Sequence, residues 1–484
     1  MTRSDIPRVD AEAEFSPQVL LDAFENFQGS FFDLDRDRQI SAGELKKLKT
    51  ELLGQMLRGG LTAGEKLIAA LPNGPLFAAV WAASLEAGAC PILVHSETPE
   101  TELQRMAERW GAQFIITEAE EGRTEGEPLP AGEHGSLLWW RTGIHESSDL
   151  PTGLPGAPLH PTSGTSGGPK IAVRPGQCAI AEPLHYIATL SINQADTILC
   201  AIPMSHAYAY GMCFLVALLT SADLAFMRRF NPTLVHRALN HVDISVFPAV
   251  PLLLTFLATD EVDLVGRPRV VLSAGAPLMR KTFNAFRDRY GLCIRPLYGT
   301  TETGGISIAS SEGEFDGSVG PPMLGVEVAT PTVSDHNLGS DTGVLRVRSS
   351  SMMAGYLHNG GVDRSSLRDG WFETGDLAHI DAKGNIHLHG RLSEVINVFG
   401  YKVVPGEVEE VILQLPEVAE VKVYRGQWHG QDAVEAAIVC RGNLDRDRIV
   451  KHCEKHLVSY KCPTSIRFLD ALPRTASGKV TLSS

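Results

Sequence analysis

The stretch Thr162-Ser163-Gly164-Thr165-Ser166-Gly167-Gly168-Pro169-Lys170 consists almost entirely of glycines and short hydroxyl side chains, and it ends in a lysine. Such a backbone can bend until several amide N–H groups point at one anion. The stretch therefore predicts a phosphate-binding loop. It is not the nucleoside triphosphatase loop, whose spacing requires a glycine in place of Pro169 and a hydroxyl in place of Ile171. A flexible surface loop is the alternative.

The length and charge of the chain restrict the number of its domains and the kinds of partner that it can bind. A chain of 484 residues is too long for one hydrophobic core, so at least two domains are expected, and an apolar fraction of 43% can fill them. The formal net charge of -14 argues against a nucleic-acid partner, because nucleic-acid-binding proteins gather lysine and arginine on one face.

The sequence predicts no membrane insertion. Residues 1–5 lack the apolar core of a signal peptide, and the most apolar run, residues 214–227, is too short to span a bilayer. We therefore expect a cytoplasmic protein. The eight cysteines include no C-x-x-C pair and mostly lie in apolar surroundings, which indicates buried hydrophobic side chains and neither a metal site nor disulfides.

Residues 33–44 copy part of a calcium-binding EF-hand loop, with oxygen-bearing side chains at loop positions 1, 3, 5, 9 and 12. Arg38, however, replaces the glycine that the sharp turn requires. The alternative is a polar turn followed by a helix, with Ser41 as N-cap and Glu44 closing a capping box. We favour this alternative over calcium binding.

The next part of the chain alternates short apolar runs with helical patterns, which is typical of a parallel α/β fold. Strands are expected at residues 67–70, 90–94 and 114–117, with helices at 75–87 and 99–110. A second set of strands is expected at residues 198–203, 270–272 and 294–297. Polar, aromatic or small residues follow each strand of the second set, where open α/β sheets bind ligands. These segments are 204–211 with His206, 273–277, and 298–305.

Five segments together resemble the signature motifs of the adenylate-forming enzymes, a superfamily of acyl- and aryl-CoA synthetases, peptide-synthetase adenylation domains and firefly luciferase. They are Thr162–Lys170, Tyr298–Glu302, Phe372–Asp376, Gly390–Arg391 and Pro473–Lys479. The resemblance extends from about residue 20 to residue 484. It implies an α/β N-terminal domain at residues 1–390, made of two α/β subdomains and a small β-barrel. It also implies a smaller, mobile α+β domain at residues 391–484.

The resemblance further implies an enzyme that uses ATP and Mg²⁺ to join a carboxylate to the α-phosphorus. Because both reactants are anions, catalysis needs cations and N–H donors aimed at the phosphates. The implied catalytic residues are Lys479, His206, Thr301 and Glu302, and Glu302 is also the implied magnesium ligand. The implied nucleotide-binding residues are Thr162, Ser163, Gly164, Thr165, Ser166, Gly167, Lys170, Gly275, Ala276, Pro277, Tyr298, Gly299, Asp376 and Arg391.

Two features of the C-terminal domain follow from the same resemblance. Residues 401–409 resemble the thiol-tunnel loop of the CoA ligases, so Gly400, Tyr401 and Lys402 are expected to line a thiol tunnel. Family members often carry Asp or Lys at the hinge between the domains, and this chain has Ser393. Serine can still change its backbone angles, and whether Ser393 acts as the hinge stays open at the level of sequence.

The acid is expected to lack an α-amine. Amino-acid adenylation domains place an aspartate near residue 203 to pair with the substrate ammonium, and no carboxylate follows His206 here. An aryl or a short-to-medium acyl acid is favoured, because nearby aromatic side chains offer flat walls, although they could equally be core packing. The expected pocket residues are His206, Ala207, Tyr210, Phe247, Gly275, Gly299 and Gly304.

Several points stay open at the level of sequence. The thiol acceptor is coenzyme A or the phosphopantetheine of a carrier protein, and the protein is a monomer or a homodimer. The alternatives in function are an amino-acid adenylation enzyme, a luciferase-like oxidative enzyme, and a non-catalytic nucleotide or calcium sensor.

Overall fold

The computed structural model describes residues 17–119, 126–144, 157–162, 170–259, 264–310, 314–330, 342–358, 361–398, 401–428, 431–474, 480 and 482. The chain forms two compact units. Unit 1 comprises residues 1–327 and 348–372, and unit 2 comprises residues 328–347 and 373–484. The predicted domain boundary at residue 390 stays a prediction.

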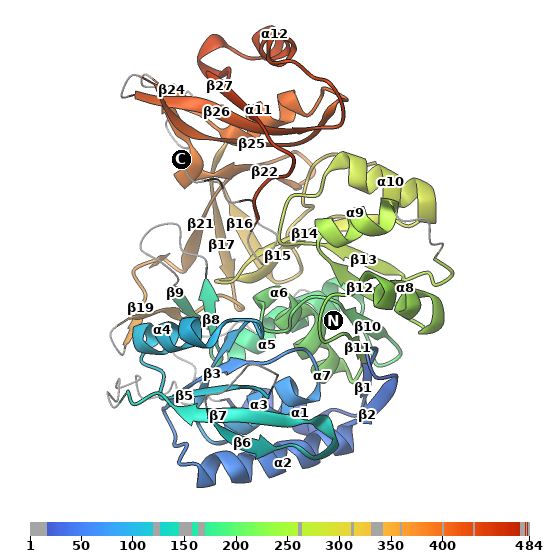
Figure 1. Ribbon diagram of the computed structural model, residues 1–484, viewed down its shortest axis with the longest axis vertical. Coiled ribbons are helices and arrows are strands. Elements are labelled where there is room, and N and C mark those ends of the chain that lie inside the picture. Colours follow the sequence, from blue (N-terminus) through green and yellow to red (C-terminus); the bar gives the residue numbers. More distant parts are fainter. Residues whose placement is uncertain are drawn as a thin grey trace. The chain divides into compact units, whose positions relative to one another are not determined.

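One large sheet of unit 1 joins strands from residues 66–173 to two strands from residues 355–363 (Figure 1). Its strand order is β19-β18-β9-β8-β4-β3-β5-β7-β6. The strands β3, β4 and β5 are parallel and almost fully buried, which explains why they appear in the sequence as continuous apolar runs. Their bounds are β3 (Lys66–Ala70), β4 (Cys90–Val94), β5 (Phe114–Glu118), β6 (Glu127–Pro130), β7 (Ser136–Arg141), β8 (Leu159–Thr162), β9 (Lys170–Val173), β18 (Gly355–His358) and β19 (Gly361–Asp363).

The second large sheet of unit 1 has the order β15-β14-β13-β12-β10-β11-β1-β2. Its middle strands β14, β13, β12, β10 and β11 are parallel neighbours. The bounds are β1 (Ser30–Asp33), β2 (Arg38–Ser41), β10 (Thr197–Cys200), β11 (Asp223–Phe226), β12 (Val246–Ala249), β13 (Val270–Ser273), β14 (Ile294–Thr300) and β15 (Gly304–Ile308). The predicted parallel α/β arrangement is confirmed for both sets of strands.

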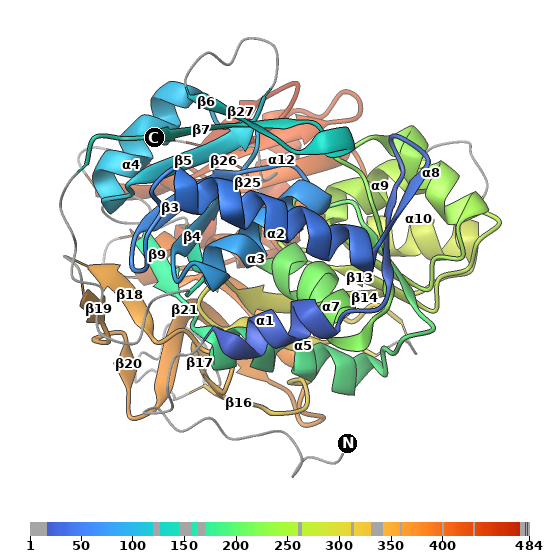
Figure 2. The ribbon, with the colours of Figure 1, turned by 90° about the horizontal axis from the view of Figure 1, so that it is seen from below.

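Helices cover these sheets and fill the space between them. The helix α3 is buried along nearly its whole length, because it is apolar on all sides, and it packs beside α2 (Figure 2). Its Phe77 and Trp81 meet Phe214 edge to face. The bounds are α1 (Gln18–Asn26), α2 (Ala42–Arg58), α3 (Pro75–Glu86), α4 (Glu100–Trp110), η1 (Gly132–His134), α5 (Gly176–Leu190), α6 (Ala207–Ala209), the π-helix η2 (Tyr210–Leu215), α7 (Val216–Thr220), α8 (Pro232–His241), α9 (Pro251–Thr259) and α10 (Arg280–Tyr290).

The segment that resembles an EF-hand loop is a β-hairpin followed by a capped helix, as the favoured alternative predicted. Asp33 accepts hydrogen bonds from the backbone N–H groups of residues 35 and 36 inside the hairpin turn. Ser41 caps α2, and the Glu44 carboxylate accepts hydrogen bonds from the Ser41 backbone and hydroxyl. The carboxylates of Asp33 and Glu44 therefore accept hydrogen bonds from backbone N–H groups of their own segment.

The remaining strands form three smaller sheets. Where the resemblance implies a small β-barrel, the chain forms a sheet of order β16-β17-β21-β20 with β22 paired to β21. Unit 2 contains the hairpin β23-β24 and the sheet β25-β26-β27, with α11 packed on β25. The bounds are β16 (Val326–Ala329), β17 (Gly343–Ser349), β20 (Leu367–Arg368), β21 (Trp371–Ile380), β22 (Ile386–Arg391), η3 (Leu392–Glu394), β23 (Ile396–Val398), β24 (Tyr401–Val403), α11 (Pro405–Ile412), β25 (Val418–Trp428), β26 (Gln431–Cys440), α12 (Arg446–His456), η4 (Ser459–Lys461) and β27 (Ser465–Phe468).

Candidate active site

Three of the predicted ligand-binding segments of unit 1 follow parallel strands at one edge of the second sheet. Because β10, β12, β13 and β14 are parallel, their carboxyl ends lie at the same edge. Ser273 at the end of β13 pairs with Pro296 in β14, and Gly275 and Tyr298 each lie two residues further along the chain. The predicted adenine segment 275–277 thus follows β13 at the sheet edge where the neighbouring strand β14 carries the predicted stacking residue Tyr298.

The turn after Tyr298 depends on glycine. A β-bulge separates Tyr298 from Gly299 where β14 pairs with β15. A Cβ on Gly299 would lie 2.5 Å from the backbone oxygen of Gly304, so a larger residue would force the two strands apart. Gly304 adopts a φ of +71°, which favours glycine. The two glycines let the turn close tightly, which holds Thr301 and Glu302 at the strand end.

The predicted phosphate loop connects two paired strands. Thr162 at the end of β8 is the antiparallel partner of Lys170 at the start of β9. Thr162 is buried and Lys170 is exposed, so the lysine side chain projects from the base of the loop. The predicted residues Ser163, Gly164, Thr165, Ser166 and Gly167 lie outside the described residues.

Tyr356 joins Lys170 to Glu302. The Lys170 ammonium lies 4.7 Å from the centroid of the Tyr356 ring, and the Tyr356 hydroxyl donates a hydrogen bond of 2.8 Å to Glu302 Oε1. Sequence reasoning missed Tyr356, because its closeness to the other two residues depends on the pairing of β18 with β9. Its only local signal is an aromatic residue in a short strand that follows a glycine.

These described residues fit a magnesium–nucleotide complex. A carboxylate is a ligand that Mg²⁺ prefers, and Glu302 uses one carboxylate oxygen for Tyr356. A lysine ammonium provides a point charge for phosphate oxygens. Unit 1 thus combines an anionic group for the metal with a cationic group for the phosphates.

The residues predicted for the acid pocket differ in how far they are buried. His206 is exposed, and its Nδ1 accepts a hydrogen bond of 3.4 Å from the Tyr208 backbone at the start of α6. Ala207 is nearly buried, and Tyr210 is fully buried with its ring against those of Trp81 and His160. Phe247 lies in the hydrophobic core, which agrees with the core-packing alternative for the aromatic residues.

A buried ion pair lies beneath the turn at residues 298–305, and sequence analysis did not single it out. Arg174 Nη1 and Glu182 Oε2 are 2.7 Å apart, and both side chains are almost entirely buried. Glu182 Oε1 also accepts hydrogen bonds from the Gly305 N–H and the Tyr186 hydroxyl. Arg174 directly follows β9 and Gly305 lies in β15, so the pair connects the strand after the phosphate loop to the strand after the turn.

Two buried histidines accompany this ion pair. Burial, assisted by the positive charge of Arg174, lowers the pKa of His160 from 6.5 to about 3 and the pKa of His185 to about 4. Both imidazoles are therefore neutral at physiological pH. Burial likewise raises the pKa of Tyr210 and Tyr186 well above the usual value, so both phenols stay protonated.

Unit 2 brings together the two predicted ribose-binding residues. Asp376 in β21 is the antiparallel partner of Arg391 in β22, and Arg391 Nε lies 3.0 Å from Asp376 Oδ1. The Asp376 backbone N–H also donates to the Thr374 hydroxyl. Asp376 is largely buried, so its carboxylate is held in one direction.

The predicted thiol-tunnel segment belongs to the same unit. Tyr401 is 48% exposed, and its ring stacks on that of Tyr460 with the centroids 4.5 Å apart. Lys402 lies beside it in β24. Gly400 and Lys479 lie outside the described residues. Ser393 lies in the short 3-10 helix η3, directly after Arg391 and Leu392.

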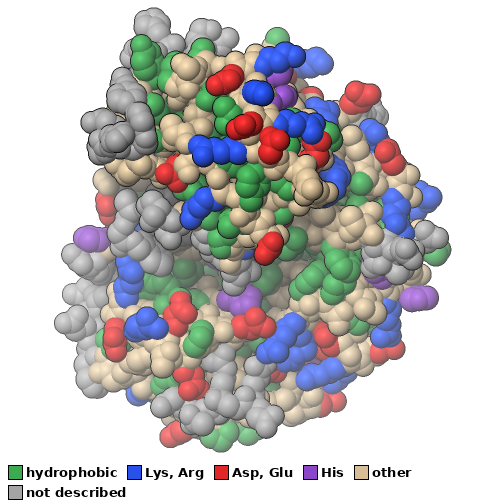
Figure 3. Space-filling view, turned by 45° about the horizontal axis from the view of Figure 1, so that its top comes forward, with side chains coloured by type: hydrophobic (Ala, Val, Ile, Leu, Met, Phe, Trp, Pro, Cys, Tyr) green, Lys and Arg blue, Asp and Glu red, His purple; other side chains and the backbone are tan. Residues whose placement is uncertain are grey.

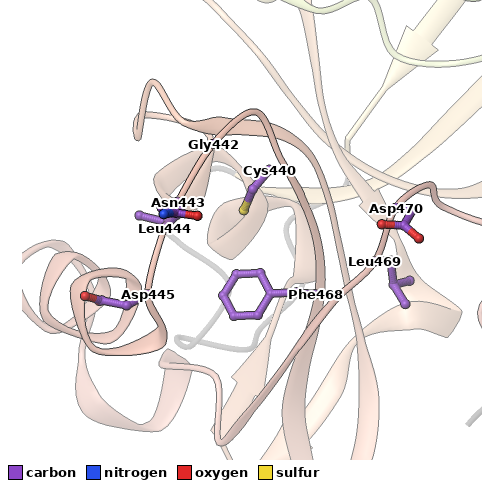
Figure 4. Close-up of a pocket in the computed structure, with 8 residues that line it drawn as sticks. All are labelled: Cys440, Gly442, Asn443, Leu444, Asp445, Phe468, Leu469 and Asp470. Atoms are coloured by element: carbon purple, nitrogen blue, oxygen red, sulfur yellow. The ribbon is translucent and has the colours of Figure 1, made fainter.

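A separate hollow of about 510 Å³ lies at the end of β26, beside the start of α12 (Figure 4). None of the predicted site residues that the structure describes lines it. Its lining residues are Cys440, Gly442, Asn443, Leu444, Asp445, Phe468, Leu469 and Asp470.

The structure also bears on the expectations about metals, membranes and charge. Within the described ranges, no group of three or more His, Cys, Asp or Glu side chains could hold a metal ion, and no helix is long and apolar enough to cross a membrane. All eight cysteines are free. On the face in Figure 3, the described Lys and Arg side chains are interspersed with Asp and Glu.

Comparison with known proteins assigns the family. Residues 24–357 match the family model "AMP-binding enzyme", and residues 407–479 match "AMP-binding enzyme C-terminal domain". The chain is 25% identical to 4-coumarate–CoA ligase 1 of Oryza sativa subsp. japonica, over 91% of this chain and 86% of that protein. It is 27% identical to the feruloyl-CoA synthase of Amycolatopsis sp, over 91% of this chain and 92% of that protein.

A solved structure shows the same fold. It is the o-succinylbenzoate coenzyme A synthetase MenE from Bacillus subtilis in complex with ATP and a magnesium ion, with a TM-score of 0.79 and 22% identity. The match covers 96% of this chain and 98% of that one. The predicted α/β fold, with a large N-terminal part and a smaller C-terminal part, is confirmed. The chain belongs to the AMP-binding enzymes, the adenylate-forming family that its motifs predicted.

Proposed function

We propose that this enzyme uses ATP to activate an aryl or short-to-medium acyl carboxylic acid without an α-amine, and then transfers the acyl group to coenzyme A. The activity class is that of an AMP-forming acid–thiol ligase, which the AMP-binding family and the CoA-ligase relatives support. ATP, Mg²⁺ and coenzyme A are the cofactors of such ligases. The observation that carries the proposal is the meeting of Lys170 and Glu302 at Tyr356.

The residues of unit 1 would bind the phosphates, the metal and the base. Lys170 and the loop that begins at Thr162 would hold the β- and γ-phosphates, and Glu302 would bind Mg²⁺. Thr301 would donate a hydrogen bond to the α-phosphate. Tyr298 would lie against the adenine, with Gly275, Ala276 and Pro277 along its edge. These groups would lower the barrier by neutralising charge while the acid carboxylate approaches the α-phosphorus.

The residues of unit 2 would bind the sugar and supply the groups for the thiol. The Asp376 carboxylate can accept hydrogen bonds from both ribose hydroxyls, and Arg391 Nε holds that carboxylate from one side. Lys479 would stabilise the transition state of adenylation. Gly400, Tyr401 and Lys402 would line the path of the thiol, and the Tyr401 ring stacks on that of Tyr460.

The acid is inferred from the residues after β10. A substrate ammonium would need a carboxylate partner, and the segment from His206 to Tyr210 supplies none. Two relatives are named for coumarate and for the feruloyl group, and the corresponding acids are aromatic and lack an α-amine. His206 and Ala207, together with Gly299 and Gly304 at the neighbouring strand end, would surround the carboxyl end of the acid.

The experiment that tests this function is acid-dependent ATP–pyrophosphate exchange across aryl, short and medium acyl, and amino acids. We expect exchange with acids that lack an α-amine and none with amino acids. Exchange with amino acids alone would instead support an amino-acid adenylation enzyme. No exchange with any acid, despite ATP binding, would support a non-catalytic nucleotide-binding protein.

The acceptor is tested in a second step with the acid that gives exchange. We expect a thioester to form when coenzyme A is added. The same reaction with a phosphopantetheinylated carrier protein separates the two acceptors. Thioester formation on the carrier protein alone would contradict coenzyme A as the acceptor and leave the activation step as proposed.

A further inference from the structure

Tyr356 contacts two side chains of opposite charge through two different parts of its own side chain. The face of its ring lies 4.7 Å from the Lys170 ammonium, and its hydroxyl lies 2.8 Å from Glu302 Oε1. Ring faces attract cations, whereas a phenol O–H donates to a carboxylate. A tyrosine is therefore suited to hold both groups at once, which neither phenylalanine nor serine could do.

The strand pairing determines why Tyr356 meets Lys170. Tyr356 in β18 is the direct partner of Ala172 in β9, and Lys170 lies two residues before Ala172. Residues two apart on a strand share a face of the sheet, so Tyr356 and Lys170 are diagonal neighbours on one face. An aromatic ring spans the distance between such neighbours.

The segment before β18 determines why Tyr356 also meets Glu302. The Met353 N–H donates to the Glu302 carbonyl oxygen at 2.6 Å, and the Ser351 hydroxyl donates to the Thr303 carbonyl oxygen at 2.7 Å. Two hydrogen bonds thus tie the chain just before Tyr356 to the turn that carries Glu302. The contact between Tyr356 and Glu302 is part of a fixed backbone arrangement.

We propose that Tyr356 is a positioning residue that orients Glu302 toward Mg²⁺ and holds Lys170 ready for the nucleotide phosphates. The proposal rests on the function proposed above. The Tyr356 hydroxyl occupies one oxygen of Glu302 and leaves the other for the metal. The ring holds the lysine cation beside the site, so that the ammonium need not pair with the Glu302 carboxylate before ATP binds.

The test compares Tyr356→Phe and Tyr356→Leu with a control tyrosine in the same unit. Tyr290→Phe is the control, because the Tyr290 hydroxyl bonds the Leu257 carbonyl oxygen inside the core. ATP binding is measured by calorimetry over a series of Mg²⁺ concentrations with no acid present, so that no turnover occurs. Thermal melting of each variant verifies that it is folded.

Tyr356→Phe removes only the hydroxyl contact with Glu302, whereas Tyr356→Leu also removes the ring contact with Lys170. Residues that orient a metal ligand typically change metal affinity by about 10–100-fold. We therefore expect Tyr356→Phe to raise the Mg²⁺ concentration for half-maximal ATP binding about tenfold or more, with metal-free ATP binding unchanged. Tyr356→Leu should in addition weaken metal-free ATP binding, because Lys170 loses its ring. Tyr290→Phe should change neither quantity.

A double variant distinguishes positioning from general destabilisation. If Tyr356 acts through Glu302, then Tyr356→Phe combined with Glu302→Gln should need no more Mg²⁺ than Glu302→Gln alone. Additive effects, or an unchanged Mg²⁺ requirement in Tyr356→Phe, would overturn the proposal. If the unaltered protein bound no ATP and gave no exchange, the proposed function would fail first. If Tyr356→Leu did not fold, Tyr356→Phe and the double variant would decide.

Discussion

Single residues at this site are held by partners that come from distant parts of the chain. Glu302 is oriented by Tyr356, and Asp376 is held by Arg391 and by the Thr374 hydroxyl. A carboxylate with a fixed partner loses little further freedom when its ligand binds. The predicted site residues Glu302 and Asp376 are therefore each held by a side chain from outside its own motif.

The buried histidines give a prediction about acidity. His160 and His185 stay neutral in the folded protein because burial lowers their pKa to about 3 and about 4. When the chain unfolds below pH 6.5, both take up protons, so stability should fall as the pH is lowered. Each histidine should lower the free energy of unfolding by about 1.4 kcal/mol for each pH unit between about pH 6 and about pH 4.5.

Urea unfolding at several pH values tests this prediction. His160→Gln should make the free energy of unfolding less dependent on pH by about 1.4 kcal/mol per pH unit. His241→Gln, at an exposed position at the end of α8, is the matched control and should leave the slope unchanged. An equal slope in His160→Gln and the unaltered protein would show that His160 is already protonated in the fold.

At the scale of elements, the buried ion pair couples two strands that carry predicted site residues. Arg174 and Glu182 connect the end of β9 to β15. Glycines make room for this connection, since a Cβ on Gly304 would lie 2.6 Å from the Glu182 carboxyl carbon, and a Cβ on Gly305 would lie 2.4 Å from the Tyr186 hydroxyl. The turn that carries Glu302 is thus packed directly on the ion pair.

Removal of one partner of the Arg174–Glu182 pair should strongly lower the free energy of unfolding. Glu182→Ala leaves Arg174 charged and buried without compensation, which typically costs about 3–5 kcal/mol. Glu97→Ala breaks the exposed pair with Arg229 and should cost at most about 1 kcal/mol. Urea or thermal unfolding of the two variants measures the difference. Equal losses would mean that Arg174 finds another partner or water when Glu182 is absent.

At the scale of the whole molecule, the two units contribute different groups to the proposed reaction. Unit 1 would hold the phosphates, the metal and the acid, and unit 2 would supply the ribose carboxylate, the thiol path and Lys479. In the proposed two-step reaction, different groups of unit 2 act in each step. We therefore predict that mutations can separate the two half-reactions.

Lys479→Ala tests this separation. We expect this substitution to abolish formation of the acyl-adenylate, because the transition state loses a cation, and to leave thioester formation from preformed adenylate intact. Lys455→Ala, at an exposed position in α12, is the control and should affect neither step. Equal loss of both half-reactions in Lys479→Ala would contradict the assigned role.

The sequence by itself determined the class of fold and the order of the motifs. The strands of the first sheet were predictable because parallel strands buried on both faces are continuous apolar runs, and β4 has the predicted bounds of residues 90–94. Glycine and hydroxyl patterns at residues 162–170 and after the strands β13 and β14 of the second sheet gave the prediction of nucleotide-binding segments, since such patterns are local in the chain.

Only the tertiary structure decided which distant residues meet. Tyr356 is brought to Lys170 by pairing of β18 with β9, and Glu182 is brought to Gly305 across the core. Strand pairing between segments so far apart leaves no periodicity in the local sequence, and the burial of a charge depends on what packs around it. The residues predicted to bind therefore follow from local patterns in the sequence, whereas the side chains that contact them became apparent only in the fold.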